Sequence, residues 1–160
     1  MFILINENCR RCAEYASQGS TAQNFEYHCE PGSVVGPTIY WFDVEGARAI
    51  LTAHSRPQYL IDPHTLPANT CDDLIAEHIA HVPLIEPGII ATVAFEMAGS
   101  GLQTFNILID GRHRAARALN LSKPFFCALL TEEETGRIMT TDINEMMAIS
   151  LARLLRRETQ

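Results

Sequence analysis

Blocks of apolar and polar positions follow one another from residue 38 onward and predict an α+β fold. Short apolar runs predict five strands, at 38–42, 58–61, 89–95, 104–110 and 124–130. Capping residues and helical spacing predict helices over 43–54, 69–81 and 111–121, with further helices after Thr131 and Asp142. Residues 1–38 lack a periodic apolar pattern. We therefore expect an irregular N-terminal extension over 1–38 and a single domain over 39–160.

Two supersecondary units follow from the order of these elements. The turn-forming segment 98–101 separates strands 89–95 and 104–110, which predicts a hairpin. Strand 104–110, helix 111–121 and strand 124–130 form a β-α-β unit. A crossover of this length predicts that its two strands are parallel, with the turn at Asp110 and Gly111 at a carboxyl end of the sheet.

Composition restricts the partners. The 160 residues carry a formal net charge of -7 and 47% hydrophobic residues, which suits one domain with its own core. An acidic surface repels phosphate backbones, so duplex DNA is disfavoured as a partner. No apolar stretch approaches the length of a membrane-spanning helix, and the N-terminus does not resemble a signal peptide. A cytoplasmic protein with reduced thiols is expected, and its oligomeric state is left open.

The sequence Asp110-Gly111-Arg112-His113-Arg114 carries the clearest chemical signal. It places cationic side chains in the first turn of a predicted helix, where the helix dipole already favours an anion. Residues 112–123 contain four of the twelve basic residues and no acid. This pattern favours a phosphate or carboxylate site. The alternative is that these arginines form ordinary ion pairs with neighbouring acidic residues, Asp110, Glu96 or the run 132–134.

The same turn resembles the signature turn of the ParB/sulfiredoxin-like superfamily, which includes partition proteins, sulfiredoxins and ADP-dependent serine kinases. The resemblance is clearest over 88–131 and weaker over 59–67. It implies a small mixed sheet with a parallel β-α-β element and packed helices. It also implies that nucleotide phosphates bind at Gly111, His113 and Arg114, with Arg112 beside them.

Further roles are implied by the same resemblance. Asp110 matches an aspartate that serves metal binding or catalysis in the serine kinases, so Mg²⁺ and ATP or ADP become expected cofactors. Arg112 stands where sulfiredoxins carry their catalytic cysteine, so sulfinic acid reduction is not expected. Asp62 and His64 stand in the loop where those kinases carry the base toward their small-molecule substrate, so both are candidate general bases. Glu86, at the start of the predicted hairpin, is a further candidate by its position in the sequence and not by the resemblance.

These observations leave three functions open. The first is a nucleotide-dependent phosphotransferase or hydrolase. The second is a non-catalytic, nucleotide-switched or DNA-associated factor that resembles the partition proteins. The third is a protein that binds another anion, such as a carboxylate metabolite, because a fold does not determine a function.

Cysteine and histidine residues suggest two weaker metal sites. Cys9 and Cys12, followed by His28 and Cys29, have the ligand types of a tetrahedral zinc site, but adjacent ligands are uncommon, so unligated thiols are preferred. His78 and His81, with Glu77, lie within about one helical turn. Because His78 falls on the apolar side of its helix with Leu74, Ile75, Ile79 and Val82, it is interpreted as a packing histidine.

Overall fold

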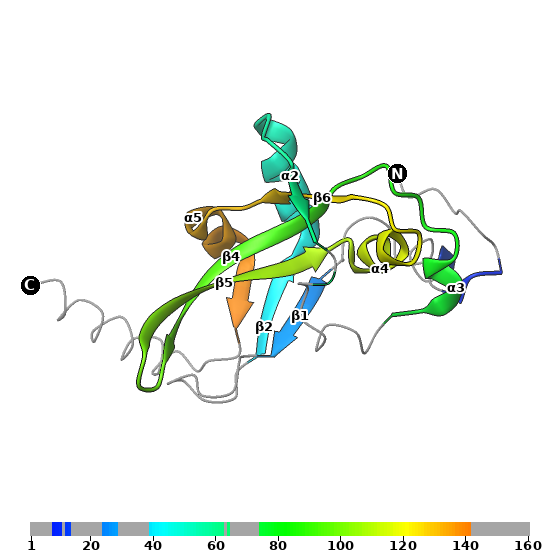
Figure 1. Ribbon diagram of the computed structural model, residues 1–160. Helices are drawn as coiled ribbons and strands as arrows, with labels where there is room; N and C mark the ends of the chain where they lie inside the picture. The colour runs from blue at the N-terminus through cyan, green and yellow to red at the C-terminus, as the bar shows by residue number, and fades with distance from the viewer. Residues whose placement is uncertain are drawn as a thin grey trace, which may run out of the picture.

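The computed structural model describes residues 8–10, 12–13, 24–28, 39–62, 64 and 74–141, which form two small sheets and four helices (Figure 1). The first sheet is antiparallel and has the order β1-β2-β7, with β1 at Asn24–His28, β2 at Ile39–Asp43 and β7 at Met139–Thr141. The second sheet has the order β3-β6-β4-β5, with β3 at Tyr59–Ile61, β4 at Gly88–Met97, β5 at Gly101–Asp110 and β6 at Phe125–Leu129. The helices are α2 at Val44–Ala53, α3 at Ala76–Ile79, α4 at Arg112–Asn120 and α5 at Glu132–Ile138.

The predicted α+β class is confirmed, and so are the elements that carry strong local signals. β4 and β5 form the predicted hairpin, in antiparallel register from Ile89 opposite Asp110 to Met97 opposite Gly101. Asp43 caps α2 by accepting the Gly46 N–H at 3.0 Å. Thr131 and Glu134 form the predicted capping box of α5. Within the described residues, no helix combines the length and the apolar character needed to span a membrane.

Successive side chains of a strand point to opposite sides, and the hairpin buries one face along most of its length and the other only near Ile90 and Leu108. One face of β4 and β5 packs with aromatic residues of the first sheet and with α2 and α5. Phe95 lies at the centre of this contact, with its ring centroid 5.2 Å from that of Tyr40 and 5.5 Å from that of Phe105. The other face, which includes Ile90 and Leu108, packs with α4 and β6.

The structure corrects the predicted β-α-β unit. β4 pairs with β5 antiparallel and with β6 parallel, so β5 and β6 run in opposite directions and are not neighbours. The crossover rule assumes a helix that returns along the strands, but α4 joins ends of β5 and β6 that lie at the same end of the sheet. Its nine residues span about 13 Å, enough to pass the end of β4 but not to run back along ten-residue strands.

Three further expectations change. The segment 1–38 was expected to be irregular, yet β1 lies within it and pairs with β2 over five residues. The predicted helix at 69–81 is helical only over α3, because Ile75 has an extended backbone, while residues 69–73 lie outside the described part. The helix predicted after Asp142 also lies outside it.

One ion pair connects the second half of the chain to the loop after α2. Arg56 forms a salt bridge with Glu134 and donates to the carbonyl oxygen of Leu129 at 3.2 Å. The hydrogen bond from Arg56 lowers the pKa of Glu134 from 4.5 to about 2. A carboxyl group whose pKa is lowered by folding stabilises the folded state above its unfolded pKa, and this contribution is lost as the pH falls through the folded value.

We expect Glu134→Gln to lower the free energy of unfolding by about 1–2 kcal/mol at pH 7, because it removes a charge-assisted hydrogen bond. The difference from the wild type should shrink as the pH falls from 4.5 toward 2. Urea unfolding across this pH range measures it. Glu133→Gln is the matched control, because the Glu133 side chain is 78% exposed. An equal loss in both variants at pH 7 would contradict the prediction.

Candidate anion site and a cysteine-histidine cluster

The turn between β5 and α4 depends on a glycine. Gly111 precedes the first helical residue and has φ +96°, in the left-handed region that other residues rarely adopt. A Cβ atom at Gly111 would lie 2.9 Å from the Cα of Gly88, at the start of β4. The absence of a side chain therefore lets β5 turn into α4 directly against β4.

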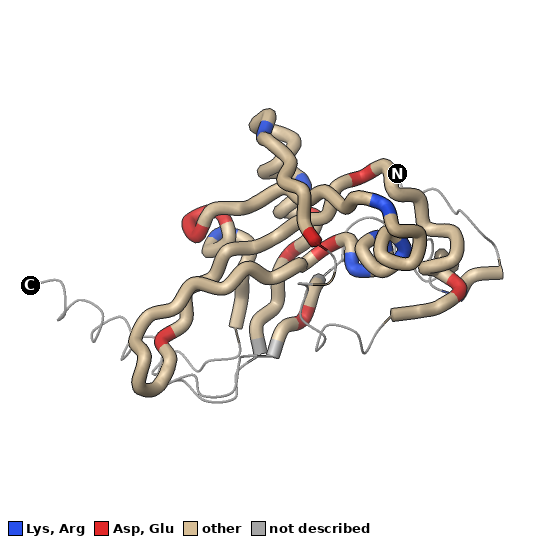
Figure 2. Tube along the Cα trace, viewed as in Figure 1, with Lys and Arg blue, Asp and Glu red and all other residues tan. Residues whose placement is uncertain are grey.

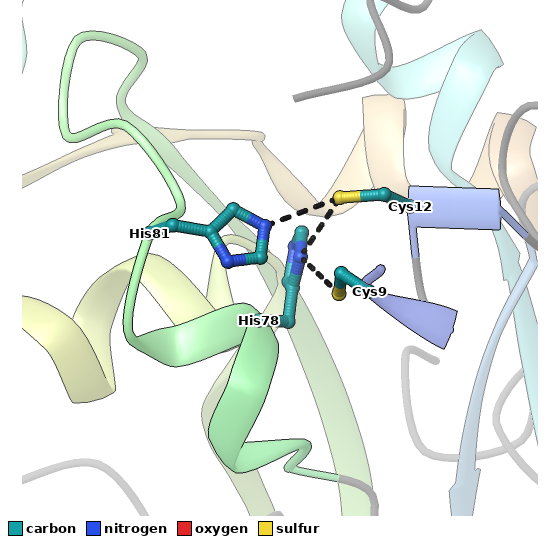
Figure 3. A group of neighbouring side chains, drawn as sticks. All are labelled: Cys9, Cys12, His78 and His81. Carbon is teal, nitrogen blue, oxygen red and sulfur yellow. Dashed lines mark hydrogen bonds between the residues drawn. The ribbon is translucent and has the colours of Figure 1, made fainter. Parts of the chain in front are cut away.

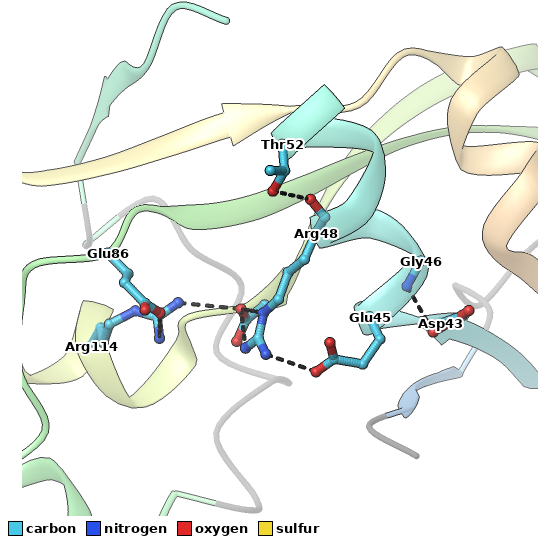
Figure 4. Close-up of polar contacts among 8 residues, drawn as sticks. Asp43, Glu45, Gly46, Arg48, Thr52, Glu86 and Arg114 are labelled. Atoms are coloured by element: carbon cyan, nitrogen blue, oxygen red, sulfur yellow. Dashed lines mark hydrogen bonds and ion pairs between the residues drawn. The ribbon is translucent and has the colours of Figure 1, made fainter. Parts of the chain in front are cut away.

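Asp110 is the buried centre of a charged network at this turn, and its two partners, Arg48 and Arg114, are labelled in Figure 4. Its Oδ2 accepts from Arg48 Nη2 at 2.9 Å and from Arg114 Nη2 at 3.3 Å. Arg48 comes from α2 and also pairs with Glu45 at 2.9 Å. Burial acts to lower the pKa of Arg48, but the charge and hydrogen bond of Asp110 outweigh it and raise that pKa above its ordinary value. The two guanidinium groups thus converge on one oxygen atom.

Arg114 also connects the turn to the segment that precedes β4. Its Nη2 donates to the carbonyl oxygen of Pro87 at 3.1 Å, and its Nη1 lies 3.7 Å from a carboxylate oxygen of Glu86. The Arg114 side chain is 12% exposed, whereas that of Glu86 is 66% exposed. Of the three candidate bases, Glu86 is therefore the one that the structure brings to the turn.

Basic positions are concentrated on α4, which carries three arginines and no acidic residue (Figure 2). The Cζ of Arg112 lies 5.4 Å from the ring centroid of Phe25 in β1, a cation–π arrangement. Arg117 donates to the carbonyl oxygen of Ile79 in α3 at 3.5 Å. His113 accepts the backbone N–H of Ile75 through Nε2 at 3.1 Å, so its ring is directed toward α3.

The other two candidate bases lie away from this turn. Asp62 follows β3, and its Oδ1 accepts the backbone N–H of His64 at 3.0 Å. Both residues are exposed. β3 and β5 are the two edges of the second sheet, three strand spacings apart, which corresponds to about 14 Å. A side chain at the end of β3 is therefore too far away to contact Asp110.

The Mg²⁺ expected at Asp110 would share its carboxylate with two arginines. The Oδ2 of Asp110 already accepts from both Arg48 and Arg114, at 2.9–3.3 Å. A divalent cation on this carboxylate would lie next to two positively charged guanidinium groups, which repel it. Asp110 is therefore suited to orienting the arginines.

The buried thiol of Cys127 does not supply a nucleophile. Burial in β6 raises the pKa of Cys127 to about 11. The thiol stays protonated at neutral pH, and the protonated form is a poor nucleophile. Cys127 therefore does not replace the cysteine that sulfiredoxins carry in the turn.

Cysteine and histidine side chains meet at a second place, beside α3 (Figure 3). The sequence paired Cys9 and Cys12 with His28 and Cys29, and it treated His78 and His81 separately. The structure instead brings Cys9, Cys12, His78 and His81 into one cluster. His78, interpreted as a packing histidine, is buried in this cluster. The side chain of His28 and residue Cys29 lie outside the described part of the chain.

Sequence reasoning did not identify Arg48 as part of the basic turn. Its local signal is the spacing of three residues from Glu45, which is typical of an exposed helix pair. Its contact with Asp110, 62 positions later, depends on how α2 packs.

Comparison of the chain with protein-family models, with curated proteins and with solved structures found no match.

We expect Asp110→Asn to lower the free energy of unfolding by about 2–4 kcal/mol, because it leaves two guanidinium groups without their shared charged partner. Thermal and urea unfolding at pH 7 measure the loss. Glu45→Gln provides a matched control, because it removes the half-exposed partner of Arg48 and should cost less than about 1 kcal/mol. If Asp110→Asn were as stable as this control, the network would have no structural role.

Proposed function

We propose that the chain binds a small phosphate-bearing ligand at the turn between β5 and α4, with a nucleotide such as ADP or ATP as the first candidate. The observation that carries this proposal is the convergence of Arg48 and Arg114 on Asp110 beside a helix N-terminus. No side chain caps that N-terminus, and its first turn contains no acidic residue. Backbone N–H groups and nearby guanidinium groups are the donors that phosphate oxygens prefer.

The ligand must replace one of the existing ion-pair partners of Arg114, and Glu86 is the partner that is most easily replaced. This carboxylate is mostly exposed and lies 3.7 Å from Arg114, whereas buried Asp110 holds the same guanidinium at 3.3 Å. Because the pair is long and its carboxylate is mostly exposed, it contributes little stability and exchanges readily. A phosphate group that displaces Glu86 gains contact with Arg114 while Asp110 keeps that side chain oriented.

The resemblance of residues 88–131 to the ParB/sulfiredoxin-like superfamily supports a nucleotide over other anions, and this family membership is itself part of the proposal. The occupied Asp110 carboxylate favours a nucleotide-switched binding protein over a phosphotransferase or hydrolase. The partition-like alternative of direct DNA association is less favoured, because the chain carries a net charge of -7.

We expect a nucleotide at 100 times its dissociation constant to stabilise the wild type by about 2.7 kcal/mol, seen as a higher melting temperature. A thermal-shift panel of ADP, ATP, CTP and GTP, with and without Mg²⁺, identifies the nucleotide, and calorimetry gives its dissociation constant. If none of the four raises the melting temperature at millimolar concentration, the proposal is wrong. Turnover of the bound nucleotide would restore the enzymatic alternative.

Two substitutions should change the affinity in opposite directions. Arg114→Ala removes a charge-assisted contact and should weaken binding about 10- to 100-fold. Glu86→Gln removes the competing carboxylate and should tighten binding about two- to five-fold. Arg137→Ala removes an arginine of α5 whose side chain is 63% exposed, so it is the matched control and should leave the affinity unchanged. Equal effects of Arg114→Ala and Arg137→Ala would place the ligand elsewhere.

A further inference from the structure

Four potential metal ligands from distant parts of the chain converge beside α3 (Figure 3). The sulfur atoms of Cys9 and Cys12 and the ring nitrogens of His78 and His81 all lie within 4.8 Å of one another. Cys9, Cys12 and His78 are at most 5% exposed, and His81 is partly buried. Two soft thiol donors with two imidazoles form the donor set of a tetrahedral zinc site.

The distances between the ligand atoms match such a site. In tetrahedral zinc coordination, a sulfur at about 2.3 Å and a nitrogen at about 2.05 Å from the ion lie about 3.6 Å apart. The Nδ1 of His78 lies 3.7 Å from the sulfur of Cys9 and 3.6 Å from that of Cys12. The Nε2 of His81 lies 3.3 Å from the sulfur of Cys12. These sulfur–nitrogen distances therefore leave room for one ion at their centre.

Each ligand pair is set by a single turn of backbone. Ala13 N–H donates to the carbonyl oxygen of Cys9 at 3.0 Å, which places the side chains at 9 and 12 on the same side of that turn. In the same way, His81 N–H donates to the carbonyl oxygen of His78 at 3.2 Å. The spacing of three residues within each pair thus brings its two ligand atoms together before the pairs meet.

Residues of α4 contact His78 and the backbone on either side of it. The ring of His113 packs edge-on against that of His78, with centroids 4.8 Å apart. The hydrogen bond from Ile75 N–H to His113 and that from Arg117 to Ile79 fix the backbone on both sides of His78. Neighbours that orient the ligands are a regular part of metal sites.

From this arrangement we infer that Cys9, Cys12, His78 and His81 bind one Zn²⁺ ion. Four protein ligands complete a tetrahedral shell and leave no open position for substrate, so the centre is structural. It joins Cys9 and Cys12 to α3. None of the four ligands belongs to the proposed phosphate site, although His113 at the start of α4 contacts His78. Zinc content and nucleotide affinity are therefore measured separately, and loss of one leaves the other testable.

The full-length wild type, purified without metal-chelating resin and dialysed, should contain about one zinc ion per chain by mass spectrometry. EDTA should remove the ion and lower the melting temperature, and added zinc should restore it, because binding to the folded state stabilises that state. Cobalt in place of zinc should give the visible absorption of a tetrahedral ion and a thiolate charge-transfer band.

The double variant Cys9→Ser/Cys12→Ser should hold less than about a tenth of an ion per chain, and EDTA should no longer shift its melting temperature. Cys127→Ser and His54→Asn are the matched controls and should keep the metal, because neither residue belongs to the cluster. Alkylation of the peptide that contains Cys9 and Cys12 should occur only after chelation.

Three results would overturn the inference. The first is a wild-type chain that stays free of zinc and cobalt after reconstitution under reducing conditions. The second is a cobalt complex without a thiolate band, which would place the metal on other ligands. The third is a disulfide between Cys9 and Cys12 that persists under those conditions. Each is measured on the wild type, so none depends on the folding of a variant.

Discussion

One face of the β4–β5 hairpin is apolar along most of its length, and the other is apolar around Ile90 and Leu108. The need to cover these surfaces determines where most of the other described elements lie. The first sheet, α2 and α5 cover one face, around the ring of Phe95. Helix α4 and strand β6 cover the other. Apolar burial is the dominant favourable term in folding, so the positions of α2 and α4 are set chiefly by this packing. The polar sites form at the edges of these contacts.

The charged network at Asp110 follows from this arrangement. Packing on one face brings Arg48 of α2 to the end of β5, and packing on the other face brings Arg114 of α4 to the same point. Neither arginine would be held there without the apolar contacts of its own helix. A buried carboxylate between two cations costs desolvation energy, which the hydrogen bonds to both guanidinium groups offset.

The sequence was informative wherever the signal is local. The cap at Asp43, the capping box of Thr131 and Glu134 and the hairpin all depend on residues close together in the chain, and all are present. The direction of β6 was wrong because strand order is a tertiary property. β1 was missed although Phe25, Glu26 and Tyr27 alternate between apolar and polar, because the run is short and surrounded by polar residues.

The cysteine-histidine cluster shows the same limit in a sharper form. Each half was visible in the sequence as a pair spaced by three residues, and each alone is weak evidence for a metal. The halves are separated by more than sixty positions, and only the position of α3 against Cys9 and Cys12 brings them together. Each pair alone is weak evidence for a metal site, but the two pairs together are strong evidence once the fold brings them into contact.

Helix α4 contacts both proposed sites, and this changes which of its basic residues are available to an external anion. As a composition, an acid-free basic helix predicts an anion site. In the structure, Arg117 and His113 hold α3, and Arg112 lies against Phe25. Most of the basic character of α4 is thus used in contacts within the chain. The capacity for an external anion is concentrated at the helix N-terminus and at Arg114, whose exposed partner Glu86 is the group that a phosphate displaces most easily.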